Sequence, residues 1–434
     1  MRQIVAYGRK VFALGTWLGR VEDARRKPLT APRLVAAAVF FTGLLRIRSF
    51  NALEPRLSEK AFGRLVGTPG DREAVCSVDT LSRALRVMGL DSVRSVSVSV
   101  VAKAERNKVL REGWHGALRY FALDGWEPIR SRHRHCRECL VRRVRVKGKG
   151  KDSAPAEVEE YYHRYVVAML IDERFDLALD FEPLRPADLR PAVVRGKKKD
   201  RLVKLNEDEG ELTAATRLLK RVRQTFGWLD VVVADALYAN GSFLSAVRDL
   251  GLGAVIVARK HTDEPLREAL RIWGKQPPHK LVETDHESIA LWDCPDLETL
   301  SSYEGKIRVV RGEVRWPADP KRTPSTWSML VTGLPARRLA PDKIMAVARA
   351  RWHIENTGFH QWTTQWRFTH VFLHSGPGIL ALYWLFFAAF NLLSLFLYCQ
   401  LKSYGRDATD VTRTISRLID EMLDELPRLA WDTS

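Results

Sequence analysis

Two short apolar runs along the chain each end in an acidic residue. Residues 118–123 lead into Asp124, and the β-branched residues 231–233 lead through an alanine into Asp235. Short runs of large or β-branched apolar residues predict buried strands. An ionised carboxylate at the end of such a strand is costly unless a cation neutralises it, although an Asp at this position can also simply cap a turn.

Further periodic segments predict an α/β arrangement around these strands. A helix is expected from Asn240 to Leu250 and a strand from Ala254 to Ala258, which makes a β-α-β unit with Asp235 at the carboxyl end of its first strand. Open α/β sheets usually place their sites at such ends. The other elements predicted in this region are strands at 118–129, 161–171 and 175–181 and a helix at 212–226.

A third acidic residue falls on a predicted helix that begins at Pro341. Apolar residues repeat at spacings of three and four along one face, which also carries Arg351 and Glu355. These two side chains could form an ordinary ion pair, but on an otherwise apolar face that is the weaker explanation. The carboxylates of Asp124, Asp235 and Glu355 could instead form an oxygen cage for Mg²⁺, which prefers oxygen ligands.

The three acidic motifs together resemble the DDE transposases of bacterial insertion sequences. The resemblance is to the group named after insertion sequence four, to which the transposon five enzyme belongs. The matching stretches are Leu-Asp-Gly at Asp124, Val-Ala-Asp-Ala-Leu-Tyr at Asp235 and Arg-x-Arg-Trp-x-Ile-Glu-Asn-x-x-Phe around Glu355. The resemblance covers roughly residues 111–400.

The chain departs from the third-acid signature of that group, which is Tyr-x2-Arg-x3-Glu-x6-Lys. Arg351 and Glu355 match it, whereas Ala348 and Trp362 stand where the Tyr and the Lys would fall. The two departures concern residues that contact phosphate in the family and not the metal ligands. A non-catalytic DNA-binding descendant of such a transposase is therefore the alternative to an active enzyme.

The order of three meandering strands, a helix and a fourth strand is that of a ribonuclease H-like catalytic core. In that fold the first and fourth strands lie side by side, which would bring Asp124 and Asp235 together. The group also has a β-rich insertion between its second and third acids, and an N-terminal region that binds the transposon end. The expected divisions are an N-terminal helical domain at 1–110, the first part of the core at 111–262 with a hairpin loop at 131–160, the β-rich insertion at 263–335, the second part of the core at 336–405, and a C-terminal helix at 406–434.

The resemblance implies an enzyme that cleaves the ends of an insertion sequence and transfers the strands in a cut-and-paste reaction. Asp124, Asp235 and Glu355 would hold two Mg²⁺ ions, one activating water or a DNA 3′-hydroxyl and the other stabilising the leaving oxygen. Double-stranded DNA would be the partner, bound by a homodimer, with no membrane, in the bacterial cytoplasm at the nucleoid. The residues expected at the DNA are Arg351, Lys260, Asn356 and Trp292.

The overall composition is that of an ordinary globular protein with a strongly basic charge. Of the 434 residues, 46% are hydrophobic and 28% are charged, which argues against disorder. The formal net charge of +18 points to a polyanionic partner, nucleic acid first and an anionic membrane surface second. Five scattered cysteines argue against a disulfide framework and fit a reducing cytosol.

One apolar segment, residues 379–399, is long enough to span a bilayer, and only Asn391 and Ser394 in it are clearly polar. Because the segment follows the helix of Glu355, we expect a core helix buried against the catalytic sheet. The alternative is a membrane span, which would make the chain a membrane-associated protein with a basic face.

The loop after the first strand contains a Cys-x2-Cys pair, Cys136 and Cys139, close to three histidines. The spacing is typical of a tetrahedral zinc site whose remaining ligands would be two of His133, His135 and His163, with His135 and His163 the preferred pair. Some relatives carry a similar Cys-x2-Cys after the first Asp. Reduced, unligated thiols in a basic loop are the alternative.

Basic and aromatic residues elsewhere have two interpretations each. The dense arginines of residues 1–110 and the basic runs near 142–151 and 195–199 could contact phosphates or form a solvated surface. Trp292, in the insertion, could stack on a flipped base or pack in a core. The amphipathic stripe of residues 411–426 predicts a helix that could dock on the core or on a second subunit.

Overall fold

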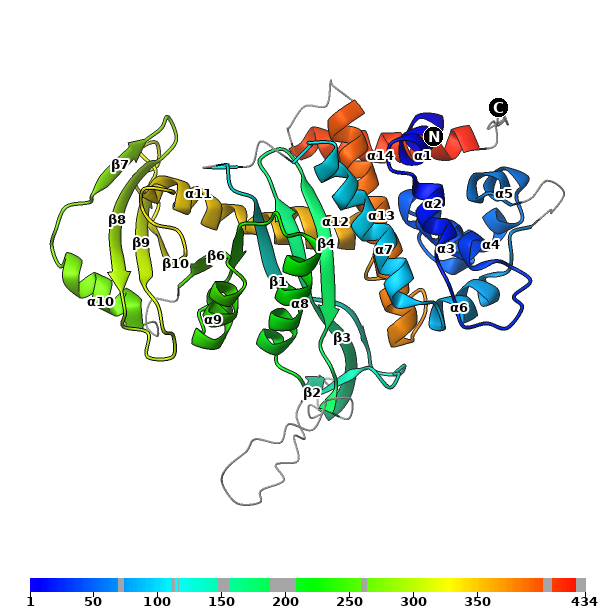
Figure 1. The fold of residues 1–434 in the computed structure, drawn as a ribbon, viewed down its shortest axis with the longest axis horizontal. Helices are drawn as coiled ribbons and strands as arrows, with labels where there is room; N and C mark the ends of the chain where they lie inside the picture. Colours follow the sequence, from blue (N-terminus) through cyan, green and yellow to red (C-terminus); the bar gives the residue numbers. More distant parts are fainter. Residues whose placement is uncertain are drawn as a thin grey trace, which may run out of the picture.

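A single ten-stranded mixed sheet organises the fold (Figure 1). The computed structural model describes residues 1–68, 74–110, 114–115, 117–146, 156–187, 208–258, 264–400 and 408–426. Within these residues the strand order is β2-β3-β1-β5-β6-β10-β9-β8-β7, and β4 also pairs with β3. The basic run near residue 195 lies outside the described residues.

The central part of the sheet has the strand order that the sequence predicts. Antiparallel strands β1, β3 and β4 are followed by β5, which lies parallel to β1 and beside β6. Helices α8 and α9 lie in front of these strands in Figure 1. The elements are β1 (Tyr120–Ser131), β2 (Leu140–Val146), β3 (Ala156–Ile171), β4 (Asp176–Pro183), α8 (Glu211–Thr225), β5 (Val231–Ala234), α9 (Gly241–Asp249) and β6 (Gly253–Val257).

Strand β2 is an element that the sequence pattern did not predict, because its arginine-rich residues suggest a solvated loop. Its stability comes from β3, where a glutamate stands opposite each arginine in the pairs Arg142–Glu160, Arg143–Glu159 and Arg145–Glu157. Opposite charges across a strand pair are favourable. Arg142 also donates to Glu127 and Glu160, at 2.6 Å each from Nη2, so this side chain is engaged inside the protein.

The insertion continues the core sheet and does not form a separate layer. It begins with a helix, α10 (Glu264–Trp273), which the expectation of a β-rich segment did not include. Four strands follow, and the last of them pairs antiparallel with β6, so the ladder runs unbroken from the core into the insertion. These strands are β7 (Lys280–Glu283), β8 (Ser288–Leu297), β9 (Ile307–Arg315) and β10 (Ser325–Thr332).

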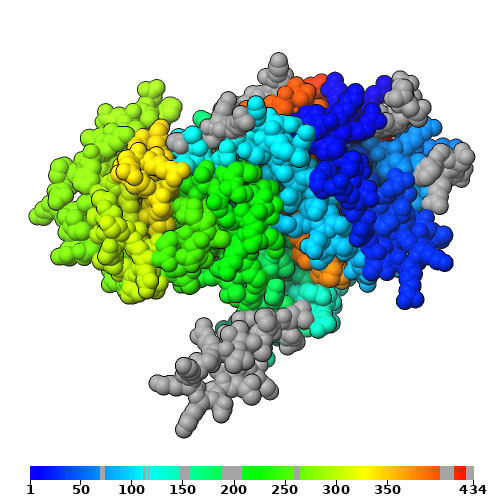
Figure 2. Space-filling model, in the orientation of Figure 1, coloured from blue at the N-terminus to red at the C-terminus, as the bar shows by residue number. Residues whose placement is uncertain are grey.

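Seven helices at the start of the chain gather at one end of the molecule, opposite the insertion (Figures 1 and 2). They share a hydrophobic core with the central sheet, because α3 and α7 both pack on α13 (Gly376–Gln400), which also contacts β4. The helices are α1 (Arg2–Lys10), α2 (Leu14–Gly19), α3 (Pro32–Leu44), α4 (Phe50–Leu57), α5 (Lys60–Val66), α6 (Val78–Arg86) and α7 (Leu90–Arg106). The boundaries of independent domains stay a prediction.

The C-terminal helix α14 (Ala408–Glu425) docks on the same chain. Ile415, Ile419 and Met422 are buried along its stripe. Glu425 accepts a hydrogen bond of 2.8 Å from the amino group of Met1. The described part of this helix therefore contacts the N-terminal end of its own chain.

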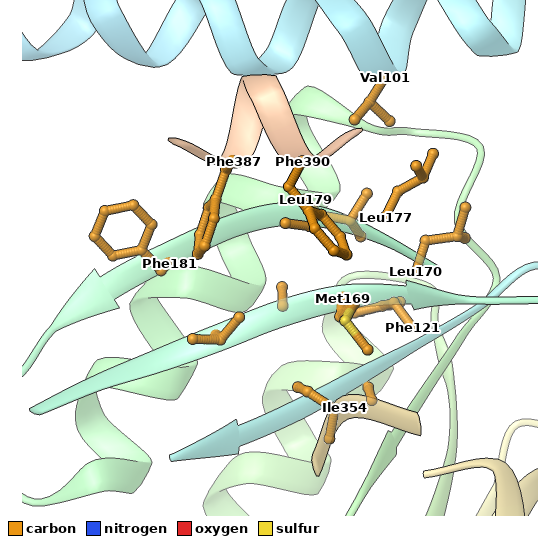
Figure 3. Close-up of a cluster of buried hydrophobic side chains, with 14 of the residues drawn as sticks. Val101, Phe121, Met169, Leu170, Leu177, Leu179, Phe181, Ile354, Phe387 and Phe390 are labelled. Carbon is orange, nitrogen blue, oxygen red and sulfur yellow. The ribbon is translucent and has the colours of Figure 1, made fainter. Parts of the chain in front are cut away.

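Helix α13 is long and apolar enough to cross a membrane, but 89% of its apolar window is buried inside the protein. Figure 3 shows Phe387 and Phe390 pointing from α13 onto β4, and the rings of Phe387 and Phe181 have centroids 5.2 Å apart. This burial agrees with the core helix expected from the sequence.

The polar residue in the middle of α13 has a specific partner. Asn391 accepts from the N–H of Ala178 at 2.8 Å and donates to its C=O at 2.7 Å. Ala178 lies on β4, and this contact satisfies the two backbone groups that point away from β3. One side chain therefore fixes α13 along the edge of β4.

Replacing Asn391 by Leu should lower the free energy of unfolding by about 2–5 kcal/mol, because two buried backbone groups lose their partner. Chemical denaturation measures this loss. Ser394→Leu is the matched control, a polar-to-Leu change at a half-buried position of the same helix, and should change stability by less than about 1 kcal/mol. Equal effects of the two substitutions would contradict the role given to Asn391.

Candidate active site

The parallel pairing of β1 with β5 aligns the first two acidic residues. Ala122 pairs with Val233, and two residues further along each strand stand Asp124 and Asp235. Backbone N–H groups orient both carboxylates, since Gly125 donates to Asp124 at 2.8 Å and Leu237 donates to Asp235 at 2.9 Å. Asp124, within β1, and Asp235, just after β5, therefore lie at the same level of neighbouring strands, as the sequence predicts.

Arg351 joins the third acidic residue to the first. Its Nη1 atom lies 3.0 Å from Oδ2 of Asp124 and 2.7 Å from Oε1 of Glu355. The sequence left open whether Arg351 and Glu355 form a plain ion pair or part of a site. The ion pair is present, and the same guanidinium nitrogen also binds Asp124; the role of these residues in a site stays a prediction.

Burial and charge make Asp124 an unusual carboxylate. Its pKa is raised to about 7, first because burial disfavours the charged form, and also because Glu355 and Asp235 are negative neighbours. Arg351 and the N–H of Gly125 act in the opposite direction. Burial is thus the main reason why the pKa of Asp124 is raised, and it outweighs the arginine at 3.0 Å.

Glu355 does not lie on the continuous α-helix that the spacing predicts. Helix α11 (Pro341–Ala350) ends before Arg351, and the chain continues through a π-helical turn, η3 (Ile354–Phe359), into α12 (His360–Thr364). Single π-turns are frequent at functional sites. Here the turn packs closely on the sheet, since a Cβ added to Gly358 would stand 3.0 Å from the sulfur of Met169, and Ile354 is drawn beside the same residue in Figure 3.

Trp362, which stands where the group signature has a lysine, is completely buried. Its ring lies 5.2 Å from the ring of Trp126 and 4.6 Å from that of Phe387. This position therefore belongs to the core between the sheet and α13.

A second polar cluster supports the acids from the opposite face of β1, and the sequence analysis missed it. Glu211, in the first turn of α8, accepts from the hydroxyl of Tyr238 at 2.8 Å and from Arg164 at 2.6 Å. A side chain at Gly125 would collide with the Glu211 carboxylate. Glu211 thus touches the residue after Asp124 and binds the tyrosine that follows Asp235, so it connects the ends of both strands.

Gly125 of the Leu-Asp-Gly motif is the one sequence feature that points to the cluster around Glu211, because a residue without a side chain leaves room for the carboxylate. Because successive residues of a strand face opposite sides, Asp124 faces Arg351 while Gly125 faces α8. Glu211 itself carries no local signal, since an acidic residue in the first turn of a helix is common.

The other residues expected at DNA are placed differently. Asn356 is exposed in η3, next to Glu355, whereas Lys260 lies outside the described residues. Trp292 lies on β8, which is four strands from β5, about 19 Å across the sheet, and its contact with DNA stays a prediction. Its indole donates to the C=O of Gln276 at 3.2 Å, so the side chain packs within the insertion.

Cysteine and histidine side chains form a separate cluster beyond the far end of β1. The ligand atoms of Cys136, Cys139, His163 and His374 all lie within 4.8 Å of one another. The prediction of His135 as a member is wrong, because its ring packs on Tyr161 with centroids 4.9 Å apart. Local spacing suggested His135, whereas His374 reaches the cluster from 235 residues away.

Gly125→Ala should lower the free energy of unfolding by about 1–3 kcal/mol, because the new methyl group displaces the Glu211 carboxylate and its hydrogen bonds. Gly210→Ala is the control, since a Cβ there meets nothing within 4 Å, and its stability should stay nearly unchanged. Denaturant unfolding compares the two variants. If the Gly125→Ala protein is as stable as the unsubstituted one, the hydrogen bonds of Glu211 do not depend on the absence of a side chain at residue 125.

Comparison with known families agrees with this geometry. Residues 202–392 match the family model described as "Transposase DDE domain". The matched segment contains Asp235 and Glu355 and begins after Asp124. No curated protein matches the chain. The large mixed sheet fits a ribonuclease H-like DDE domain, and the match supports a DDE transposase family for this chain.

Proposed function

We propose that the protein is a DNA transposase that cleaves and transfers strands at the ends of an insertion sequence by a cut-and-paste reaction. The observation that carries this proposal is the convergence of Asp124 and Glu355 on one nitrogen of Arg351, beside the parallel strand that ends in Asp235. The match to a transposase DDE domain supports the same chemistry. The group named after insertion sequence four remains our proposed assignment within that family.

Asp124, Asp235 and Glu355 are the residues proposed to hold two Mg²⁺ ions. Their donor set fits, since all three supply carboxylate oxygens, the ligand type that Mg²⁺ prefers. The placement of the acids supports the same assignment, since Asp124 and Glu355 share one nitrogen of Arg351 and Asp235 follows the strand parallel to β1. When bound, the ions would supply activation of the attacking hydroxyl and stabilisation of the leaving oxygen.

Arg351 is the proposed phosphate-binding residue of the site. Only 8% of the residue is exposed, and its guanidinium neutralises Asp124 and Glu355 in the absence of DNA. Once other cations neutralise these acids, the guanidinium can turn to a transferring phosphate, where preorganised charge contributes most. Trp362, which stands where the group has a lysine, is buried. Arg351 is therefore the residue between Pro341 and Thr364 that we assign to the phosphate.

Double-stranded DNA is the proposed partner, bound by a homodimer in the bacterial cytoplasm at the nucleoid. The net charge of +18 supports a polyanionic ligand. On β2, Arg143 and Arg145 are exposed and project from the end of the sheet that carries the hairpin. These side chains are better placed for phosphate contact than Arg142, which is bound by two glutamates.

Asp124→Asn should reduce Mg²⁺-dependent cleavage of the element's own end sequence by a hundredfold or more, because the amide cannot supply the negative charge of the carboxylate. A gel assay of strand cleavage measures the effect. Asp249→Asn, at the exposed end of α9, should cleave within a fewfold of the unsubstituted rate. Full activity of the Asp124 variant would rule out the proposed site. DNA binding without any cleavage by the unsubstituted protein would instead favour a non-catalytic DNA-binding descendant.

Arg351→Ala should also lower cleavage by a hundredfold or more, which corresponds to about 2.7 kcal/mol in the transition state. The variant should still gain thermal stability from Mn²⁺, because all three carboxylates remain. Arg349→Ala, which removes an ion pair with Glu287 on the same segment, should leave cleavage nearly unchanged. A variant that cleaves normally, or one that is no longer stabilised by Mn²⁺, would assign Arg351 a structural role.

A further inference from the structure

The cysteine–histidine cluster has the dimensions of a tetrahedral metal site. The two sulfurs of Cys136 and Cys139 are 3.6 Å apart. Nε2 of His163 lies 3.3 and 3.4 Å from these sulfurs, and Nε2 of His374 lies 3.2 Å from that of Cys139. Ordinary Zn–S and Zn–N bonds would give tetrahedron edges of about 3.8 Å between sulfurs and about 3.6 Å from sulfur to nitrogen. The observed separations are within a few tenths of an ångström of these edges.

The cluster does not have the geometry of a disulfide. Both cysteines are free, and the sulfur separation of 3.6 Å is far above the bond length of about 2.05 Å. Both histidines direct a ring nitrogen at the sulfurs. Two thiol sulfurs and two imidazole nitrogens facing one point are a donor set that favours zinc over hard cations such as Mg²⁺.

We propose that Cys136, Cys139, His163 and His374 bind one structural Zn²⁺ ion. Four protein ligands fill a tetrahedral ion completely, which is the arrangement of structural rather than catalytic zinc. Cys139 and His163 are buried at 4% and 5% exposure, so the site is closed on its inner side. Asp124 is five residues before Ile129, the partner of His163 in the sheet, so about 17 Å of strand separates the zinc ligands from the acids.

The zinc ion connects segments that are distant in sequence. The two cysteines lie in the loop between β1 and β2, His163 lies on β3, and His374 immediately precedes α13. An independent contact brings the same segments together, since a Cβ added to Gly376 would stand only 2.7 Å from Cβ of Glu138. The cysteine loop is thus already packed on the start of α13. Zinc bound at this point would fix the β2–β3 hairpin, which has the exposed arginines of β2, to the start of α13.

Metal analysis of the full-length protein, expressed with zinc and purified without chelator, tests this proposal. We expect one zinc ion per chain, and protein without zinc would overturn the assignment. A disulfide between Cys136 and Cys139 found by mass spectrometry in freshly purified, zinc-free protein would overturn it in favour of a redox pair.

Variants locate the ligands. His374→Ala and Cys136→Ser should lose most of the zinc, whereas His135→Ala and Cys294→Ala should retain it. Retention of zinc by the His374 variant together with loss by the His135 variant would restore the ligand set suggested by local spacing, and would overturn ours. None of these measurements depends on DNA cleavage, so the zinc proposal is tested independently of the transposase function.

Cobalt substitution of the unsubstituted protein gives the same test without a variant that could misfold. Exchange of Zn²⁺ for Co²⁺ should produce thiolate-to-cobalt charge-transfer absorption and the intense visible bands of a tetrahedral ion. Weak, octahedral-type bands would overturn the four-ligand site. Removal of the metal by chelator should lower the thermal midpoint by several degrees, and re-addition of Zn²⁺ should restore it.

Discussion

The site depends on the parallel pairing of β1 with β5. The backbone ladder fixes the two aspartates at the same level of neighbouring strands, and their mutual repulsion is then opposed by Arg351 and by backbone N–H groups. The stability of this pairing comes from the apolar residues of β1 and β5 that are buried in the core. Apolar packing therefore supplies the free energy that keeps like charges adjacent.

Helix α13 gives the molecule a common core. Its aromatic residues contact the sheet and the segment of Trp362, while α3 and α7 pack on its other sides. The N-terminal helices and the catalytic sheet are thus linked through one apolar helix. Asn391 is the polar exception, and its two hydrogen bonds to Ala178 set how the helix lies along β4.

The sequence predicts elements whose stability is local and misses those whose partners are distant. The strands that carry Asp124 and precede Asp235 are apparent because the runs before these acids are apolar, and their adjacency follows from strand order. Strand β2 is hidden because its arginines are stabilised by glutamates on β3. His374 and Glu211 are hidden for a related reason, since each acts through residues that only the fold brings near. The break in the helix at Glu355 was also missed, because a π-turn has no distinctive spacing of apolar residues.

That π-turn constrains the length of the chain as well as its chemistry. Each residue of an α-helix rotates its successors by about 100°, so in a regular α-helix Glu355 and Trp362, which are 362 − 355 = 7 positions apart, would face nearly the same direction. The π-turn at Ile354–Phe359 separates the two directions. The acid can therefore reach Arg351 while the indole fills the space beside Trp126. An insertion between Arg351 and Trp362 that shifts this phase should be far less tolerated than substitutions at the exposed positions of the same segment.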